Sequence, residues 1–178
     1  MMEPVDLEPK PRRELPAKDW ALTGAEGREQ NIVRSLWLGE GVLEEHNHKL
    51  QAKYDRIQQD EVLCEEYQLD DAEIVIVAYG VAARIVRAAV DRARTDGVPV
   101  GLIRPITLWP FPTETISRAA EELRIFLTVE MSMGQMIDDV KLAVAGKAPV
   151  LFYGRAGGGV PTVDELIEQI HQLTIAGN

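Results

Sequence analysis

The chain has 178 residues, 46% of them hydrophobic, which suffices for one domain of ordinary size with an extension. Acidic residues outnumber basic ones 29 to 19, and the net charge of -10 argues against a nucleic-acid partner, because no basic face is visible to neutralise phosphates. The single cysteine, Cys64, excludes an internal disulfide and a four-cysteine iron–sulfur or zinc site. This cysteine usage leads us to expect a cytoplasmic protein, and no apolar run is long enough to cross a membrane, so we expect no membrane partner.

Residues 1–70 predict a linker or arm without a core of its own. Four prolines alternate with charges before Asp19, and such a stretch buries too little surface to offset its ordering entropy. Residues 20–38 are rich in apolar side chains but broken by two glycines, so this segment needs a surface to lie on. Residues 41–67 carry apolar residues at helical spacing and predict one long amphipathic helix. Two of its histidines, His46 and His48, are two apart and cannot bind one metal together.

Residues 71–178 predict an α/β domain. Four short apolar runs, at residues 73–78, 99–103, 125–129 and 149–153, alternate with helical patterns that follow Gly80, Pro112, Ser132 and Pro161. Near-continuous Ile, Val and Leu is typical of parallel strands covered on both faces. The order of elements therefore predicts an open, doubly wound, mainly parallel sheet.

The first and second turns after these strands offer candidate sites. Gly80 opens a helix whose free N–H groups could attract an anion, but a permissive turn explains the glycine without a ligand. Arg104, at the end of the second strand, could pair with a carboxylate or phosphate across a subunit boundary. Trp109 and Phe111 follow in a proline-rich turn that predicts a contact surface. A local salt bridge, with both aromatic rings in the domain's own core, is the alternative.

The third turn, residues 130–136, contains Glu130, Gly134 and Gln135. A carboxylate at a strand end beside a helix start is a favourable place for a general base, but no histidine or second acid is near it in sequence. Ser132 and Gln135 have capping-box spacing, which explains both structurally. Three methionines in this turn suit an adaptable packing surface better than a cofactor site.

The fourth turn, residues 154–159, contains Arg155, Gly157 and Gly158. It lacks the Lys-Ser/Thr pair of a P-loop, and its glycines are not spaced as in the dinucleotide fingerprint. Arg155 and the glycine amides could still form an anion-binding nest, although loop geometry also explains them. Thr162 and Glu165 predict a capping box at the start of the last helix, on whose outward side His171 lies.

Several segments resemble a known enzyme family. Residues 71–80, an alanine-rich helix, Gly97, a second strand and Arg104-Pro105 resemble the C-terminal domain of transketolase-like thiamine diphosphate enzymes. Residues 106–112, 130–136 and 20–24 together resemble α subunits of 2-oxoacid:ferredoxin oxidoreductases, with the 2-oxoisovalerate type favoured. The resemblance covers nearly the whole chain, and residues 1–70 match the connection after the family's pyrimidine-binding domain.

The resemblance implies a transketolase C-terminal-like fold within an α subunit. Because the family's subunit begins with a pyrimidine-binding domain that is absent from this sequence, we expect an expressed fragment that is inactive alone. Thiamine diphosphate, magnesium, iron–sulfur clusters and coenzyme A are expected in the full complex, with no cofactor held by this chain. The implied partners are the missing pyrimidine-binding domain, the β and γ/δ subunits, and ferredoxin through the complex.

Two functions remain open. The chain is either a structural and docking module, or it contributes contacts to coenzyme A or a regulatory anion through Arg104, Arg155 and the glycine loop. Val81 stands where many related domains have Ser or Thr, which weakens a ligand site at the first turn. The large apolar side chains outside the helix stripes predict self-association, most simply as a homodimer in which arm or turn residues of one copy cover the other.

Overall fold

The computed structural model describes residues 9, 11–12, 14–122 and 124–176. The chain divides into two units, one up to Asn47 and one from His48 onward. Among the described residues before Val42 there is no regular helix or strand. Within this first unit the Asn31 side-chain amide donates hydrogen bonds to the carbonyls of Asp19 (2.6 Å) and Ala21 (3.0 Å). The large apolar side chains of the arm are mostly exposed, so this segment has no core of its own in the described structure.

Helix α1 (Val42–Asp60) ends earlier than the sequence pattern predicts. The expected helix over residues 41–67 is wrong beyond Asp60, because Cys64–Tyr67 form strand β1 instead. Strand β1 pairs antiparallel with β3 (Val100–Pro105), and Glu65 lies opposite Arg104 in this ladder. None of the α1 side chains is fully buried, so its apolar stripe is largely open.

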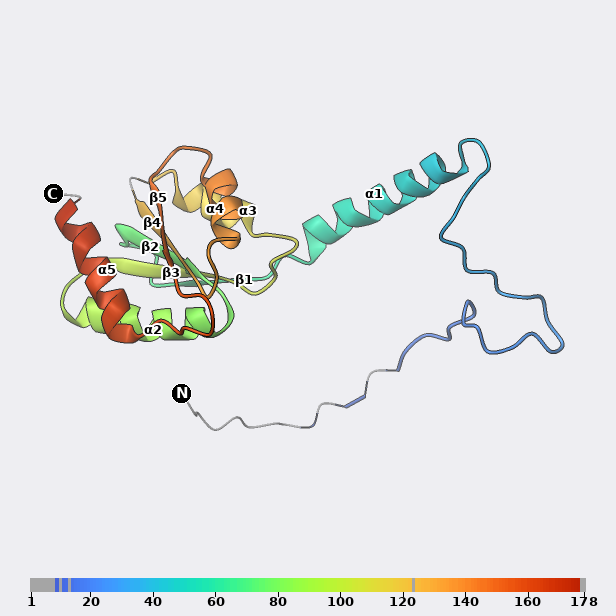
Figure 1. Ribbon diagram of the computed structural model, residues 1–178, viewed down its shortest axis with the longest axis horizontal. Helices are drawn as coiled ribbons and strands as arrows, with labels where there is room; N and C mark the ends of the chain where they lie inside the picture. The colour runs from blue at the N-terminus through green and yellow to red at the C-terminus, as the bar shows by residue number, and fades with distance from the viewer. Residues whose placement is uncertain (1–8, 10, 13, 123, 177–178) are drawn as a thin grey trace. The chain divides into compact units, whose positions relative to one another are not determined.

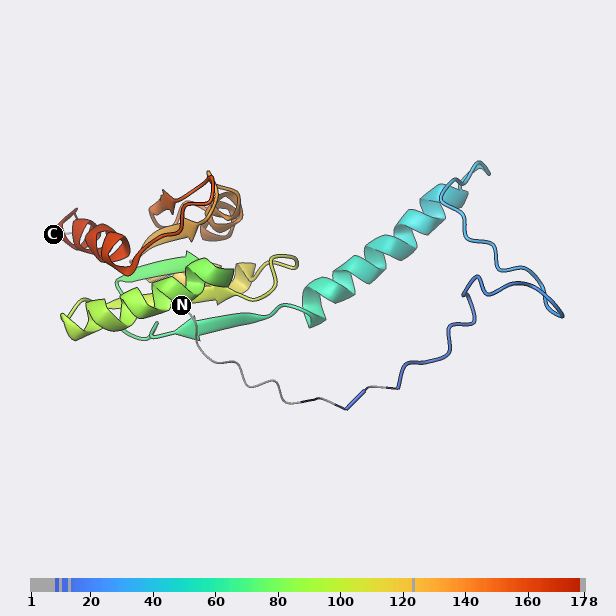
Figure 2. The same ribbon diagram turned by 60° about the horizontal axis from the view of Figure 1, so that its bottom comes forward.

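The sheet has five strands in the order β1-β3-β2-β4-β5 (Figures 1 and 2). Strands β2 (Ile74–Ala78), β3, β4 (Ile125–Glu130) and β5 (Val150–Gly154) are parallel to one another. This confirms the predicted open, doubly wound sheet, and each predicted strand lies within about one or two residues of its observed bounds. The expected domain boundary at Asp70 stays a prediction. Strand β1, which belongs to the sheet, precedes this boundary in the sequence.

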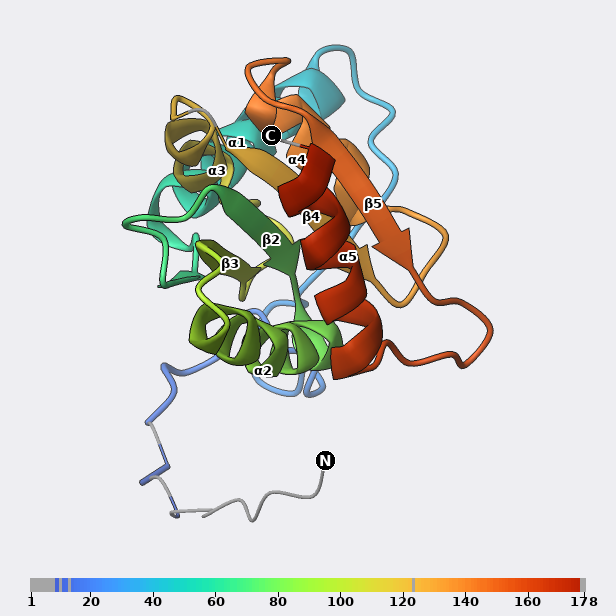
Figure 3. The same cartoon turned by 90° about the vertical axis from the view of Figure 1, so that its left-hand side faces the viewer.

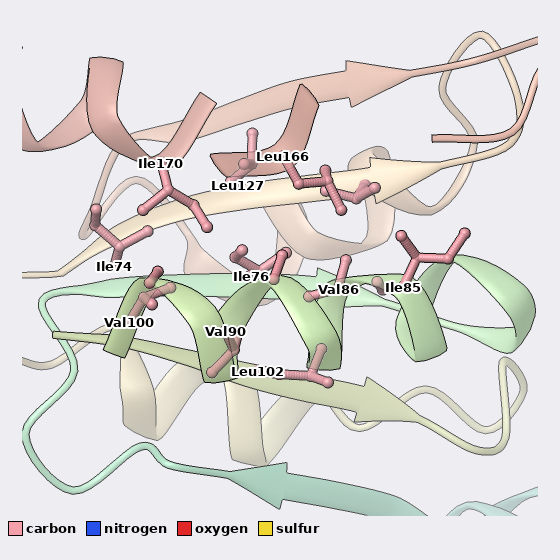
Figure 4. Close-up of a cluster of buried hydrophobic side chains, with 14 of the residues drawn as sticks. Ile74, Ile76, Ile85, Val86, Val90, Val100, Leu102, Leu127, Leu166 and Ile170 are labelled. Atoms are coloured by element: carbon pink, nitrogen blue, oxygen red, sulfur yellow. The ribbon is translucent and has the colours of Figure 1, made fainter. Parts of the chain in front are cut away.

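Two helices cover each face of the sheet. Helices α2 (Gly80–Thr95) and α5 (Val163–Ala176) lie on one face, and α3 (Thr113–Ala119) and α4 (Met136–Val144) lie on the other (Figure 3). The alternating side chains of β2 divide between the two cores: Ile74 and Ile76 face α2 and α5, whereas Val75 and Val77 face α3 and α4. Figure 4 shows the first core, where Val86 and Val90 of α2 meet β2 and β3.

Candidate functional site

The strand order places the topological switch point between β2 and β4. The chain leaves β2 toward β3 on one side and returns to β4 on the other, and ligands of open α/β sheets usually bind at the carboxyl ends of such a strand pair. Gly80 lies there as the first residue of α2, with φ at 56°, a left-handed value that favours glycine. The preceding residue, Tyr79, makes no side-chain hydrogen bond to the helix start.

Glu130, at the end of β4, places its own carboxylate at the N-terminus of the neighbouring helix, α4. The side chain is fully buried and lies over the N-terminus of α4. Its Oε1 accepts the N–H groups of Gln135 (3.2 Å) and Ile137 (3.0 Å). Its Oε2 accepts the N–H groups of Gln135 (3.1 Å) and Met136 (3.0 Å), and the hydroxyl of Ser132 (3.1 Å). The carboxylate thus occupies the place where an anion at this helix N-terminus would bind.

The predicted capping box between Ser132 and Gln135 is wrong. Gln135 occupies the N-cap position without a side-chain hydrogen bond, and the Ser132 hydroxyl instead accepts the N–H of Gly134 (3.0 Å) and donates to Glu130. The buried Glu130 carboxylate caps the N-terminus of α4 instead, because it accepts hydrogen bonds from several donors at once. Sequence reasoning placed Glu130 at a strand end but missed this capping role.

The third and fourth turns pack tightly against each other at Gly154, and Gly134 shapes the third turn. A Cβ added to Gly154 would lie 2.5 Å from the backbone oxygen of Ser132, so a side chain there would displace the backbone. Gly134 has φ at 106°, a left-handed value that favours glycine, and an added Cβ would lie 3.2 Å from a side-chain carbon of Ile137. Gly154 therefore serves close packing between β5 and the loop before α4, whereas Gly134 supplies the backbone conformation of that loop.

Arg155 in the fourth turn is paired within the domain. Its guanidinium forms an ion pair with Glu165, and the predicted capping box is confirmed: the Thr162 N–H donates to Glu165 (2.8 Å) and the Glu165 N–H donates to the Thr162 hydroxyl (3.2 Å). The Thr162 N–H is the main cause that lowers the pKa of Glu165, with Arg155 adding to it. The pKa of Arg155 is raised, first by the Tyr153 hydroxyl and then by Glu165. Gly157 and Gly158 have φ values of 64° and 85°, as their turn requires.

Arg104, in β3 just before the second turn, also has a local partner. Glu65 accepts from both Arg104 (3.1 Å) and Arg87 (2.7 Å), and Arg87 stacks over the Tyr67 ring at 4.2 Å. The positions of Arg104 and Arg155 are separated by strands β2 and β4, which is about 14 Å at the usual strand spacing. The structure therefore does not bring the two arginines together around one small anion.

Trp109 and Phe111, the aromatic residues of the second turn, differ in how far they are buried. Trp109 is 55% exposed and meets Tyr54 edge-on, with ring centroids 5.7 Å apart, whereas Phe111 is half-buried against the core beneath α3 and α4. Both line a hollow of about 530 Å³ that also involves Gln58, Gln59 and Glu114. Among the three methionines of the third turn, Met136 belongs to the core at 4% exposure, while Met131 and Met133 are exposed.

The described residues contain no cluster of His, Cys, Asp and Glu that could hold a metal ion. His171 is exposed on α5, as predicted. Over the same described part of the chain, no helix combines the length and apolar character needed to span a membrane.

Comparisons with known proteins give the site its context. The model of the family described as "Pyruvate:ferredoxin oxidoreductase core domain II" matches residues 72–166. Ketoisovalerate oxidoreductase subunit VorB of Methanothermobacter marburgensis is 42% identical over 178 residues, which cover 100% of this chain and 50% of that protein. The chain thus spans about half the length of this curated relative.

Two solved structures share the fold. A 2-oxoglutarate:ferredoxin oxidoreductase from Magnetococcus marinus, solved with 2-oxoglutarate, coenzyme A and succinyl-CoA bound, matches with a TM-score of 0.63 at 18% identity, over 84% of this chain and 26% of that one. A split-gene transketolase, described as an inactive β4 tetramer, matches with a TM-score of 0.50 at 16% identity, over 61% of this chain and 40% of that one. The fold is therefore of the transketolase C-terminal-like kind.

Proposed function

Because the chain belongs to the pyruvate:ferredoxin oxidoreductase core domain II family, we propose that it is the structural and docking domain of an α subunit of a 2-oxoacid:ferredoxin oxidoreductase. The whole enzyme would decarboxylate a 2-oxoacid on thiamine diphosphate, transfer electrons through iron–sulfur clusters to ferredoxin and form an acyl-CoA. The identity to a ketoisovalerate oxidoreductase subunit favours a branched-chain 2-oxoacid as substrate. No catalytic residue is assigned to this chain.

The docking role rests on a contrast between two kinds of side chain in the turns that follow the strands. The charged side chains are paired within the domain, whereas large apolar side chains are exposed. Glu130 fills the N-terminus of α4, and Glu165 neutralises Arg155, so these charged side chains already have partners within the domain. Trp109, at 55% exposure, and Met133, at 84%, are nevertheless left open. Tryptophan and methionine are enriched in protein interfaces relative to the rest of the surface.

We assign this surface to contacts within the enzyme complex. The proposed partners are the pyrimidine-binding domain of the same subunit and the β and γ/δ subunits, with ferredoxin reached through the complex. Thiamine diphosphate, magnesium and the clusters would be held elsewhere, since the sequence has one cysteine and the described residues hold no metal-ligating cluster. A cytoplasmic location and self-association of the isolated chain complete the proposal.

Binding to the remaining parts of the complex tests this function. A pyrimidine-binding domain of the family, prepared with its β and γ/δ subunits, should bind this chain when supplied separately. Trp109→Gln should weaken that binding by about tenfold or more, because buried tryptophans dominate interface energies. Leu142→Gln is the control, since it removes an exposed apolar side chain from the outer face of α4, away from the Trp109 turn.

The expected result is loss of affinity in Trp109→Gln alone, with unchanged far-ultraviolet circular dichroism. Equal affinity of wild type and Trp109→Gln would contradict a docking role for this turn. The isolated chain should also show no 2-oxoacid-dependent reduction of a viologen dye, and measurable turnover would refute the scaffold proposal.

A coenzyme A or anion-binding role is the alternative. It is less well supported, because Arg104 and Arg155 each have a carboxylate partner, and Arg104 lies in β3 whereas Arg155 follows β5. Calorimetric titration of the chain with coenzyme A distinguishes the two: the docking proposal predicts no binding heat, whereas saturable heat that is lost in Arg155→Gln would favour the alternative.

A further inference from the structure

The two edges of the sheet differ in how they are protected. Strand β1 forms one edge and carries Glu65 and Glu66. Glu65 is held by Arg104 and Arg87, and Glu66 by Arg118 at 2.6 Å. Charged side chains on an edge strand disfavour pairing with another chain. The β1 edge is therefore protected against further strands.

Strand β5 forms the other edge and lacks such protection. Residues 150–154 read Val-Leu-Phe-Tyr-Gly, without a charge or a proline. Figure 3 shows β5 as the outermost strand beyond β4, and no described strand of this unit lies on its outer side. Leu151 is 41% exposed, and the other four residues are partly exposed. An uncharged, apolar edge of this kind is a template for strand addition.

The hydrogen-bond pattern identifies which backbone groups face outward. The Pro149 carbonyl accepts the N–H of Phe126, and the N–H of Arg155 donates to the Glu130 carbonyl. In a parallel ladder, alternate residues of a strand bond to the same neighbour, so residues 149, 151, 153 and 155 face β4. The N–H and C=O groups of Val150, Phe152 and Gly154 consequently point away from the sheet.

We propose that this edge pairs with the β5 edge of a second copy of the chain, antiparallel about a two-fold axis at Phe152. The outward-facing residues are placed symmetrically about Phe152, so Phe152 meets Phe152 of the second copy and Val150 meets Gly154. Each of these three residues offers one N–H and one C=O, and the pairing forms six hydrogen bonds that use all of them. The strand is thus its own complement, as a two-fold interface requires.

Charge and shape favour the same arrangement. Each copy has a net charge of -10, so two copies repel overall, but the β5 strands that would pair at the interface are uncharged. The nearest cation, Arg155, is neutralised by Glu165. Gly154 brings no side chain opposite Val150, and the partly exposed Leu151 gains an apolar neighbour in Tyr153 of the second copy.

Sedimentation of matched lysine variants tests the contact. Wild type should sediment as a dimer at high micromolar concentration. Leu151→Lys should weaken the dimer by about tenfold or more, because it places two like charges near the two-fold axis. Leu63→Lys is the control: it makes the same change at an exposed leucine beside the opposite edge strand and should leave the dimer intact.

Cysteine cross-linking tests the register. Residues 151 and 153 of opposite copies would form a non-hydrogen-bonded pair with Cα atoms about 4.5 Å apart, within disulfide range. In a Cys64→Ser background, a mixture of Leu151→Cys and Tyr153→Cys should therefore cross-link upon oxidation. Leu151→Cys alone should not, because its diagonal spacing to its own mate is about 7–8 Å.

A monomeric wild type, or a dimer lost equally in Leu63→Lys and Leu151→Lys, would overturn the proposal. Cross-linking of Leu151→Cys alone at the rate of the mixture would refute the register. Circular dichroism of each variant identifies loss of folding, and the cross-linking mixture remains decisive if Leu151→Lys is unstable. A monomeric wild type that still binds the other subunits through Trp109 would leave the docking function standing, so the two proposals fail separately.

Discussion

Replacing Glu130 by glutamine should strongly destabilise the α/β unit. The carboxylate accepts the N–H groups of Gln135, Met136 and Ile137, and both oxygens are used. An amide of the same size offers one acceptor and turns an NH₂ group toward buried donors, so at least one N–H loses its partner. A hydrogen bond to a charged group contributes about 1.5–3 kcal/mol, and the lost charge at the helix N-terminus adds roughly 0.3–1 kcal/mol. We expect the free energy of unfolding to fall by about 3 kcal/mol.

Urea unfolding followed by circular dichroism measures this loss, which corresponds to a decrease in Tm of roughly 10 °C for a unit of this size. Asp139→Asn is the matched control. It makes the same chemical change in the first turn of α4, but the Asp139 side chain is exposed. Only the interaction with the helix dipole is lost there, so its cost should be about 0.3–1 kcal/mol.

Hydrogen exchange adds a local measurement. The amides of Met136 and Ile137 should exchange faster in Glu130→Gln than in Asp139→Asn, because only the first variant removes their acceptor. A Glu130→Gln protein as stable as Asp139→Asn, with both amides still protected, would show that the carboxylate does not hold the start of α4.

Further predictions concern a thiol, a cap and the arm. Burial is the main cause that raises the pKa of Cys64 to about 11 from 9.0, with Glu66 and Glu65 adding to it. Because the reactive thiolate then forms only at higher pH, alkylation of Cys64 by iodoacetamide at pH 8 should be about 100-fold slower than for an ordinary thiol. A pH–rate profile with a midpoint near 9 would contradict this. Thr162→Val removes the hydroxyl that accepts the Glu165 N–H and should cost about 1 kcal/mol in urea unfolding, whereas no loss would show that the capping box adds nothing. Limited trypsin digestion should cut at the exposed Lys18, Arg28 and Arg34 before any site after Cys64, and equal protection of both regions would refute a coreless arm.

The parallel strands and their helices could be predicted because each carries its own local signal. The β2 sequence Ile-Val-Ile-Val-Ala is buried along its full length, which the continuous apolar run anticipated. Strand β1 has no such signal, since Cys-Glu-Glu-Tyr contains two acids. It forms because it pairs with β3 and because Arg104 of β3 and Arg118 of α3 form ion pairs with its glutamates. Those partners are distant in sequence, so a local pattern could not reveal them.

In the candidate site, too, features with partners close in sequence could be predicted and those with more distant partners could not. The Thr162–Glu165 box was predictable, because both partners lie within one helical turn and Glu165 keeps its bonds to Thr162 while it also pairs with Arg155. The equally well-spaced Ser132–Gln135 pair failed. There, a buried carboxylate from the preceding strand reaches the same helix start, and a charged acceptor outcompetes a neutral one for backbone donors. A glutamate that ends a strand shortly before a glycine-containing turn and a helix is the signal that could have indicated this cap.

The methionines of the third turn show why a docking surface is harder to predict than a core. Met133 and Met136 are three residues apart and chemically identical, yet Met136 is 4% exposed and Met133 is 84% exposed. The difference arises because α4 begins at Met136 and turns that side chain toward the sheet, while Met133 lies in the loop that Glu130 fixes through its bonds to the helix start. The buried carboxylate thus holds the loop in which an apolar side chain remains exposed. A polar cap and an interface are in this way parts of one local structure, and a change at Glu130 should alter docking as well as stability.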